Sequence, residues 1–280
     1  MFEDVNPKGA IDMPDERDYQ AEHILGKDDA PLPEKVKFLT RAHNQGRSVK
    51  CTAYSTYHVG QILNEIEHNT QVNSLPDAGW ELQKKFGTYS KEGDYVQTAL
   101  KSIVRNGLKT LEGFFPIDGY AKIEKKDIDY WLAKGFPIIT SSFVTASNFK
   151  KAKHDGIWGG NDGPHRTGHA FALIGYEPFY KLALNSYGED WGKFKNGTFL
   201  IREEDVSHLN TCYILYDRQD MKYLFKDLTS NSWAYDDVKW AKDNGLVKGY
   251  DDNTFRPDAP ITRAEAISLL KKYDESRKRK

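Results

Sequence analysis

The chain is organised around one stretch, Asn44-Gln45-Gly46-Arg47-Ser48-Val49-Lys50-Cys51-Thr52-Ala53-Tyr54-Ser55. Within it a single thiol, Cys51, follows a loop that contains glycine and begins an apolar run with helical spacing. The pattern predicts that Cys51 lies in the first turn of a helix, where N–H groups and the positive end of the helix dipole stabilise a thiolate. Gln45, six residues upstream, carries an amide that can donate to a developing oxyanion. A buried, inert cysteine is the competing interpretation.

The composition limits the class of protein. A chain of 280 residues can form one sizeable core with a small appendage, or two domains. The formal net charge of -1 gives no electrostatic reason to expect nucleic-acid binding. No apolar run approaches the roughly 20 residues that cross a bilayer, and the mean hydropathy is -0.71. Residues 1–7 lack the features of a secretory signal, so we expect either a removed signal or another export route.

The chain has two cysteines, Cys51 and Cys212. A bond between them would consume the thiol of Cys51, and two cysteines cannot build a dense disulfide framework. We therefore expect two free thiols. No Cys/His spacing is compact enough for a zinc site, so neither a metal nor a cofactor is expected.

The periodicity changes once within the first 216 residues. Helical patterns are expected from Cys51 onward and over residues 78–86, 96–105 and 127–133. Short apolar runs predict strands at 136–143, 170–176, 181–184, 198–201 and 213–216. A helical half followed by a strand-rich half predicts an α+β fold with its active site in the cleft between the halves.

Thiol catalysis needs a base for the proton and a third group that orients the base. His169 stands at the entrance of one strand-like run, and Asn185 stands sixteen residues later at the end of another. Adjacent antiparallel strands would bring them together, with the Asn185 carbonyl on one ring nitrogen and the other nitrogen facing Cys51. Taken singly, a core histidine and a turn asparagine are the competing interpretations.

The ordered set Gln45, Cys51, His169 and Asn185 resembles the papain-like cysteine peptidases, and the resemblance extends over about residues 12–216. It implies that Cys51 is the nucleophile, His169 the general base and acid, Asn185 the orienting group and Gln45 the oxyanion donor. Two further segments resemble the family: Pro14-Asp15-Glu16-Arg17-Asp18-Tyr19 and Glu92-Gly93. By the same likeness Gly93 presents its backbone to the substrate.

Five positions depart from the family's pattern, among them Val49 and Lys50, which replace a small Gly-Ser pair. Ser48 replaces a disulfide-forming cysteine, and Thr52 replaces a tryptophan. Tyr187 replaces the tryptophan that shields the His-Asn hydrogen bond, and we place it with Gly93 on the substrate-binding surface. Lys50, beside Cys51, is expected to favour the thiolate.

Residues 225–273 form a different pattern, with two short helices around a polar loop. Thr262 and Glu265 have the spacing of a capping box. The Asp251-Asp252-Asn253 cluster lacks the ligand spacing of a calcium loop, so a plain turn is favoured. The whole segment resembles a single S-layer homology repeat through Trp233-Ala234, residues 245–250, 254–257 and 261–265.

In that family the repeat attaches proteins to acidic secondary cell-wall polysaccharide of bacteria. The resemblance implies that Lys248, Arg256 and Arg263 contact the anionic glycan and that Trp233 stacks on sugar. The alternative is that Trp233 and Arg263 build the core and cap of the module.

These patterns predict a papain-like cysteine peptidase domain with an N-terminal lead-in segment at residues 1–222, and a single S-layer homology module with a basic tail at residues 223–280. The expected fold class is α+β, with a helical lobe, an antiparallel β-barrel-like lobe and a small all-α module. The expected function is a cysteine endopeptidase with a Cys-His-Asn triad, acting on protein or peptide substrates. Its expected place is the bacterial cell surface, held on wall polysaccharide or secreted. The alternatives are a phage virion component and a catalytically inactive papain-like protein that docks on the wall.

Overall fold

The computed structural model describes residues 20–88, 90, 93–159, 167–217, 223–225, 227–229, 233–250 and 254–278. The chain divides into two compact units, which are described separately. Unit 1 contains residues 30–217, and unit 2 contains the described residues of 20–29 and 218–280. The division after residue 217 is close to the predicted boundary at 222. Residues 20–29, by contrast, lie with the C-terminal unit and not with the peptidase domain to which the sequence analysis assigned them.

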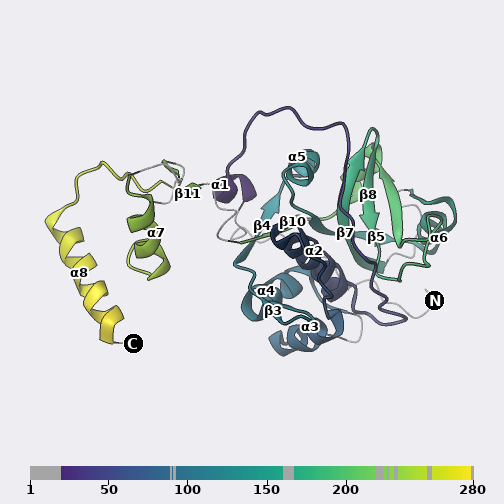
Figure 1. The fold of residues 1–280 in the computed structure, drawn as a ribbon, viewed down its shortest axis with the longest axis horizontal. Coiled ribbons are helices and arrows are strands. Elements are labelled where there is room, and N and C mark those ends of the chain that lie inside the picture. The colour runs from purple at the N-terminus through teal and green to yellow at the C-terminus, as the bar shows by residue number, and fades with distance from the viewer. Residues whose placement is uncertain are drawn as a thin grey trace. The chain divides into compact units, whose positions relative to one another are not determined.

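The central helix of unit 1 is α2, which contacts the sheet through β7 and β5 and also contacts α3 and α4. Figure 1 shows α3 and α4 on one side of α2 and the strands of the sheet on another. Because α2 is enclosed in this way, every residue from Cys51 to Asn64 is buried. The helices of unit 1 are α2 (Cys51–His68), α3 (Pro76–Gln83), η1 (Lys84–Phe86), α4 (Val96–Asn106), η2 (Lys125–Asp127), α5 (Ile128–Ala133), α6 (Ala146–Asp155) and η3 (Glu203–His208).

The sheet of unit 1 has the strand order β4-β10-β5-β7-β8-β9-β6, with β1 paired to β7. All of its pairs are antiparallel except β6 with β9. A separate hairpin joins β2 (Leu108–Lys109) to β3 (Phe114–Phe115). The strands of the main sheet are β1 (Val36–Lys37), β4 (Gly119–Ile123), β5 (Ile138–Val144), β6 (Ile157–Trp158), β7 (Thr167–Glu177), β8 (Tyr180–Leu184), β9 (Thr198–Arg202) and β10 (Cys212–Tyr216).

The long strand β7 forms the middle of this sheet, and its apolar run is buried from His169 to Tyr176. Its pairing with β8 shifts register between Leu173 and Gly175. At Gly175 the carbonyl oxygen of Val36 would lie only 2.2 Å from a Cβ atom, so this close approach of β1 requires glycine.

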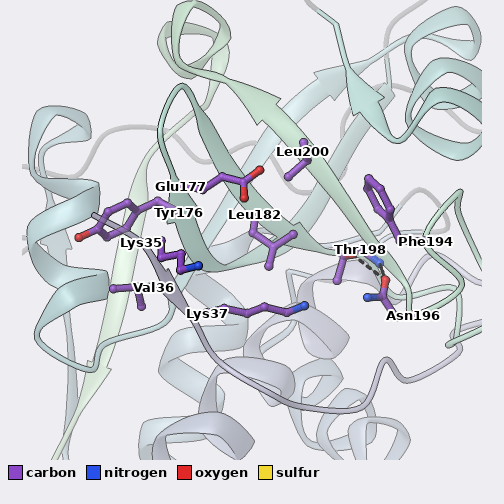
Figure 2. Close-up of a pocket in the computed structure, with 10 residues that line it drawn as sticks. All are labelled: Lys35, Val36, Lys37, Tyr176, Glu177, Leu182, Phe194, Asn196, Thr198 and Leu200. Atoms are coloured by element: carbon purple, nitrogen blue, oxygen red, sulfur yellow. Dashed lines mark hydrogen bonds between the residues drawn. The ribbon is translucent and has the colours of Figure 1, made fainter. Parts of the chain in front are cut away.

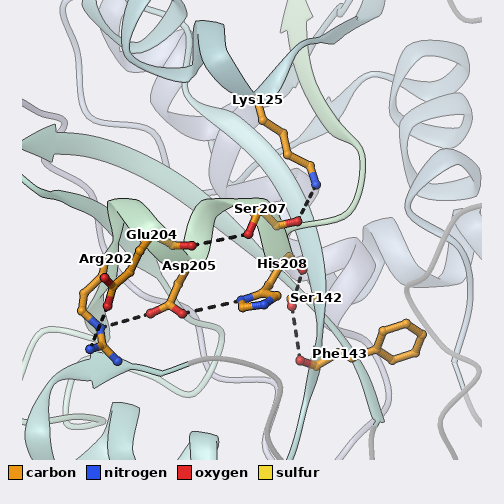
Figure 3. A network of polar contacts seen from close by, with 8 residues as sticks. All are labelled: Lys125, Ser142, Phe143, Arg202, Glu204, Asp205, Ser207 and His208. Carbon is orange, nitrogen blue, oxygen red and sulfur yellow. Dashed lines mark hydrogen bonds and ion pairs between the residues drawn. The ribbon is translucent and has the colours of Figure 1, made fainter.

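A polar network supports the strand that faces His169, as Figure 3 shows. Ser142 of β5 pairs with His169 of β7, and its Oγ donates to the carbonyl of His208 (3.0 Å). His208 ends the 3-10 helix η3 (Glu203–His208), in which its Nδ1 lies 3.5 Å from Oδ1 of Asp205. The turn between β9 and β10 is thereby tied to β5 next to the candidate site.

Unit 2 contains the two helices that the sequence analysis predicted. It also contains a short hairpin that the sequence analysis did not predict. Its core is formed by Phe225, Leu228, Ala234 and Val238. The predicted capping box is confirmed, because Thr262 Oγ1 accepts from the N–H of Glu265 (3.2 Å) and Glu265 Oε2 accepts from the N–H of Thr262 (2.8 Å). The elements are α1 (Ala21–Leu25), β11 (Tyr223–Phe225), β12 (Leu228–Thr229), α7 (Tyr235–Asp243) and α8 (Arg263–Lys278).

Helix α1 comes from the other end of the sequence and packs against β11. Ala21 and Leu25 lie one turn apart on it and are 1% and 5% exposed. Unit 2 is therefore built from both ends of the chain. None of the helices in the described ranges is long and apolar enough to cross a membrane.

Candidate active site

Cys51 is the first residue of α2, as predicted. No side chain caps this end of the helix and no acidic residue lies in its first turn, so the first N–H groups remain available to the thiol. Burial raises the pKa of the Cys51 thiol, while backbone hydrogen bonds from Ala170 and Thr52 act in the opposite direction. The sulfur therefore lies beside the strand that carries His169.

His169 and Asn185 are brought together by the antiparallel pairing of β7 and β8. The ring Nε2 of His169 lies 2.8 Å from Oδ1 of Asn185. The same oxygen accepts from the N–H of Ser186 (2.9 Å), which fixes its direction. Because an amide oxygen only accepts, Nε2 carries the proton and Nδ1 is left as an acceptor. Burial lowers the pKa of His169, and the bond to Asn185 partly opposes this shift. Burial thus favours the neutral imidazole, whose Nδ1 can take a proton.

Aromatic rings cover this histidine. The ring of Tyr187 stacks on His169 at 5.7 Å with an interplanar angle of 23°. Phe149, from α6, meets both rings edge-on, at 6.5 Å from His169 and 5.3 Å from Tyr187. These rings shield the His169–Asn185 bond from water, which is the task that the sequence analysis gave to an aromatic at position 187.

Gln45 lies in the loop before α2 and is held by two segments. Its backbone N–H donates to the carbonyl of Ser186 (2.8 Å), and its Oε1 accepts from Ser186 Oγ (2.5 Å). Its Nε2 donates to the carbonyl of Ser48 (2.6 Å). Ser48 Oγ in turn donates to the Gln45 carbonyl (2.6 Å), so a hydrogen bond closes the loop where the family has a disulfide partner. One hydrogen of the Gln45 amide remains for another acceptor.

Comparison with solved structures shows what this arrangement is similar to. Xylellain, a cysteine protease from Xylella fastidiosa, is similar with a TM-score of 0.59 and 18% identity over 75% of this chain and 96% of that one. The Carica candamarcensis cysteine protease CMS1MS2, solved in complex with E-64, is similar with a TM-score of 0.57 and 18% identity over 66% of this chain and 99% of that one. The N-terminal part of the chain has a papain-like fold. The predicted fold class is thereby confirmed.

The C-terminal part matches a sequence family. The family model of the S-layer homology domain matches residues 224–267. Cell surface glycoprotein 1 of Acetivibrio thermocellus is 51% identical over 46 residues, which are 16% of this chain and 2% of that protein. The cellulosome-anchoring protein of the same organism is 43% identical over 51 residues, 18% of this chain and 11% of that protein. The chain thus spans only a small part of these relatives. Their cell-surface names give no support to the phage alternative.

Within the papain-like unit, Lys50 has a partner that the sequence analysis did not foresee. Its Nζ pairs with Oδ1 of Asp77 at 2.7 Å, which offsets the charge that was expected to favour the Cys51 thiolate. Asp77 also accepts from the hydroxyl of Tyr54 (3.1 Å) and lies in the first turn of α3. The carboxylate therefore ties Lys50 and the first turn of α2 to the start of α3.

The backbone of Gly93 is already paired. Its N–H donates to the carbonyl of Ser90 (3.2 Å), and its carbonyl accepts from the Ser90 N–H (3.0 Å). The Ser90 hydroxyl also donates to this carbonyl (3.3 Å), so a substrate strand that used Gly93 would compete with all three bonds. Glu92 and the segment Pro14–Tyr19, which also carried the resemblance, lie outside the described residues.

A pocket of about 570 Å³ lies elsewhere in the papain-like unit. Figure 2 shows it beside the strands β1, β7, β8 and β9. None of the predicted site residues lines it. The lining residues are Lys35, Val36, Lys37, Tyr176, Glu177, Leu182, Phe194, Asn196, Thr198 and Leu200.

The predicted glycan-binding residues of the S-layer homology domain are exposed. Trp233 is 78% exposed and does not belong to the core of unit 2. Lys248 and Arg256 are also exposed, and the Arg256 guanidinium lies 4.1 Å from the centre of the Tyr250 ring. Arg263 is exposed at the first position of α8. The interpretation of Trp233 as a core residue therefore does not hold.

Sequence reasoning missed two contributors to the candidate site. Phe149 lies on α6, a helix that the sequence analysis did not predict, and nothing in the local pattern pointed toward His169. Ser186 was given no role in the sequence analysis, yet it forms hydrogen bonds with both Gln45 and Asn185. Its position directly after Asn185 was the one available signal.

Proposed function

We propose that the papain-like unit is a cysteine endopeptidase that hydrolyses peptide bonds with Cys51 as nucleophile, His169 as base and acid, Asn185 as orienting group and Gln45 as oxyanion donor. The observation that carries the proposal is the buried His169–Asn185 hydrogen bond of 2.8 Å on the strand whose next residue, Ala170, contacts the Cys51 sulfur. A neutral imidazole with a free Nδ1 beside a thiol at a helix N-terminus is the pairing that thiol catalysis needs.

The reaction follows from these groups. The Cys51 proton passes to Nδ1 of His169, and the sulfur attacks the peptide carbonyl carbon. The developing oxyanion accepts from the free N–H of the Gln45 amide and from the backbone N–H of Cys51. When the C–N bond breaks, the imidazolium gives its proton to the leaving amine. A water molecule, deprotonated by His169, then hydrolyses the thioester and restores the thiol.

The S-layer homology domain suggests where the peptidase acts. We propose that it attaches the peptidase to acidic polysaccharide of a bacterial cell wall, through Trp233, Lys248, Arg256 and Arg263. The exposure of these side chains supports the proposal, since a glycan needs accessible cations and an aromatic face. The attached chain would act on protein or peptide substrates at the cell surface.

Two variants test the chemistry. Cys51→Ala should abolish cleavage of a fluorogenic peptide while circular dichroism stays that of the wild type. In the wild type, E-64 should label one thiol per chain, because Cys212 is 1% exposed and burial raises its pKa to about 11. Cys212→Ala serves as the control that keeps both labelling and activity. Cleavage that persists in folded Cys51→Ala would contradict the assignment.

Pull-down with purified bacterial cell walls tests the attachment. The wild type should bind walls and lose binding once acidic polysaccharide is extracted. Trp233→Ala should weaken binding, whereas Trp240→Ala, which changes a half-exposed tryptophan of the same unit, should not. Equal binding to intact and extracted walls would argue against the proposal.

A catalytically inactive wall-binding protein is the second candidate. The pairing of Gly93 with Ser90 favours it, because that pairing occupies backbone groups that a substrate would use. Under this alternative the wild type binds walls but neither reacts with E-64 nor cleaves peptides.

A further inference from the structure

Three buried polar side chains connect the start of α2 to the segment that carries Gly93. Gln83, the last residue of α3, donates through Nε2 to Oγ1 of Thr52 (3.0 Å) and to Oδ2 of Asp94 (3.0 Å). Thr52, Gln83 and Asp94 are 0%, 1% and 3% exposed. Thr52 directly follows Cys51, and Asp94 directly follows Gly93. The chain of hydrogen bonds therefore joins the residue next to the proposed nucleophile to the residue next to Gly93, whose backbone is expected to face the substrate.

The charge of Asp94 fixes the direction of the Gln83 amide. If the amide were rotated by half a turn, its oxygen would face the Asp94 carboxylate, and two acceptors repel each other. With the NH₂ group between Thr52 and Asp94, the oxygen Oε1 of Gln83 is buried and has no hydrogen-bond partner in the described part of the chain. The Gln83 amide therefore donates two hydrogen bonds, while its oxygen stays buried without a partner in the described residues.

Asp94 depends on these donors. Its Oδ1 accepts from the hydroxyl of Thr88 (2.6 Å) and from the N–H of Tyr95 (2.8 Å). All the hydrogen-bond donors that reach it within the described residues are neutral. A buried carboxylate is costly without such donors, so removing one of them should move the segment.

We propose that Gln83 and Asp94 are positioning residues that hold the Gly93 segment at a fixed place relative to Cys51, and so decide how the substrate is held beside the thiol. Ser90 holds Gly93 through two backbone hydrogen bonds. Asp94, the next residue in the chain, is itself held by the Gln83 amide. A displacement of about 1 Å at such a place can cost up to about a hundredfold in rate. This inference rests on the proposed peptidase function.

The test uses Gln83→Leu, which removes both N–H bonds, and Thr52→Val, which removes only the acceptor and keeps the shape of the side chain. Both should raise KM for a peptide substrate about tenfold and change kcat less than about threefold. Alkylation of Cys51 by iodoacetamide, which needs no substrate strand, should change less than about twofold. Asn106→Leu is the matched control, since within the described residues its amide binds Ser102 of the same helix alone.

Amide hydrogen exchange supplies a measurement that does not depend on activity. The N–H groups of Gly93 and Tyr95 should exchange faster in both variants than in the wild type or in Asn106→Leu. If the wild type is active, and folded Thr52→Val and Gln83→Leu both keep the wild-type KM, the inference is wrong. Unchanged exchange in both would also overturn it. A wild type without peptidase activity would instead contradict the proposed function.

Discussion

His43 and His58 stack on each other with ring centroids 5.1 Å apart, and the backbone N–H of His43 donates to Nε2 of His58 at 2.9 Å. His43 lies two residues before Gln45, and its carbonyl accepts from the N–H of Gly188 (3.0 Å). The pair therefore anchors the loop that carries the proposed oxyanion donor to the helix α2 and to the segment after Asn185.

This pair predicts a loss of stability in acid. Burial lowers the pKa of both rings, that of His58 well below the ordinary value. At His43 the hydrogen bond to Gln61 and the charges of Asp77 and Glu189 partly oppose the shift in pKa. Because the folded-state values lie below the unfolded one, the stabilisation is complete above about pH 6.5 and is lost as the pH falls through the folded-state values.

Urea unfolding between pH 7 and pH 4.5 measures this effect. His58→Gln keeps an acceptor but cannot be protonated, so the slope of unfolding free energy against pH should fall by up to about 1.4 kcal/mol per pH unit. The exposed His154 gives the control variant His154→Gln. An unchanged slope in folded His58→Gln would show that acid acts elsewhere.

Tyr187 should set the proton affinity of His169. In Tyr187→Ala the ring loses its stacked cover, so the pKa of His169, which burial lowers, should rise toward 6.5. Tyr187→Trp keeps an aromatic cover and should leave it low. Imidazole carbon chemical shifts, followed by NMR in a Cys51→Ala background, measure the value directly. Equal pKa values in the two variants would mean that Phe149 alone provides the shield.

Lys181 should contribute moderately to stability. Its side chain is 3% exposed, and Nζ lies 2.7 Å from Asp129 and 2.6 Å from Glu203, whose side chains are 36% and 61% exposed. Since water reaches both carboxylates, Lys181→Ala should lower the free energy of unfolding by about 2 kcal/mol, less than the 3–5 of a fully buried pair. Lys181→Met keeps the packing and should cost about half as much. Chemical denaturation measures the free energy of unfolding. A decrease below about 0.5 kcal/mol in Lys181→Ala would show that the ion pairs of Lys181 add little to stability.

The packing of α1 predicts a link between the N-terminus and wall attachment. Leu25→Asp places a carboxylate where the side chain is 5% exposed, and should destabilise unit 2 by about 3 kcal/mol or more. Limited proteolysis should then cut unit 2 faster, and wall binding should fall while peptide cleavage persists. The exposed Glu22→Gln is the control on the same helix. Unaltered proteolysis and wall binding in Leu25→Asp would show that α1 is not needed by unit 2.

The sequence alone determined the features that depend on near neighbours in the chain. The start of α2 at Cys51, the end of α4 before Gly107 and the capping box at Thr262 are fixed by residues a few positions apart, and all three are present. The five predicted strands are present too, because an apolar run of four to eight residues bounded by turn residues has few other solutions.

The tertiary structure decided what depends on residues far apart. It placed Phe149 against His169, turned Lys50 toward Asp77, joined Thr52 to Asp94 through Gln83, and packed α1 on β11. None of these contacts leaves a periodic signal, since each partner's local pattern is satisfied equally well without the other. They arise only when burial forces distant polar and aromatic groups to find partners in the folded chain.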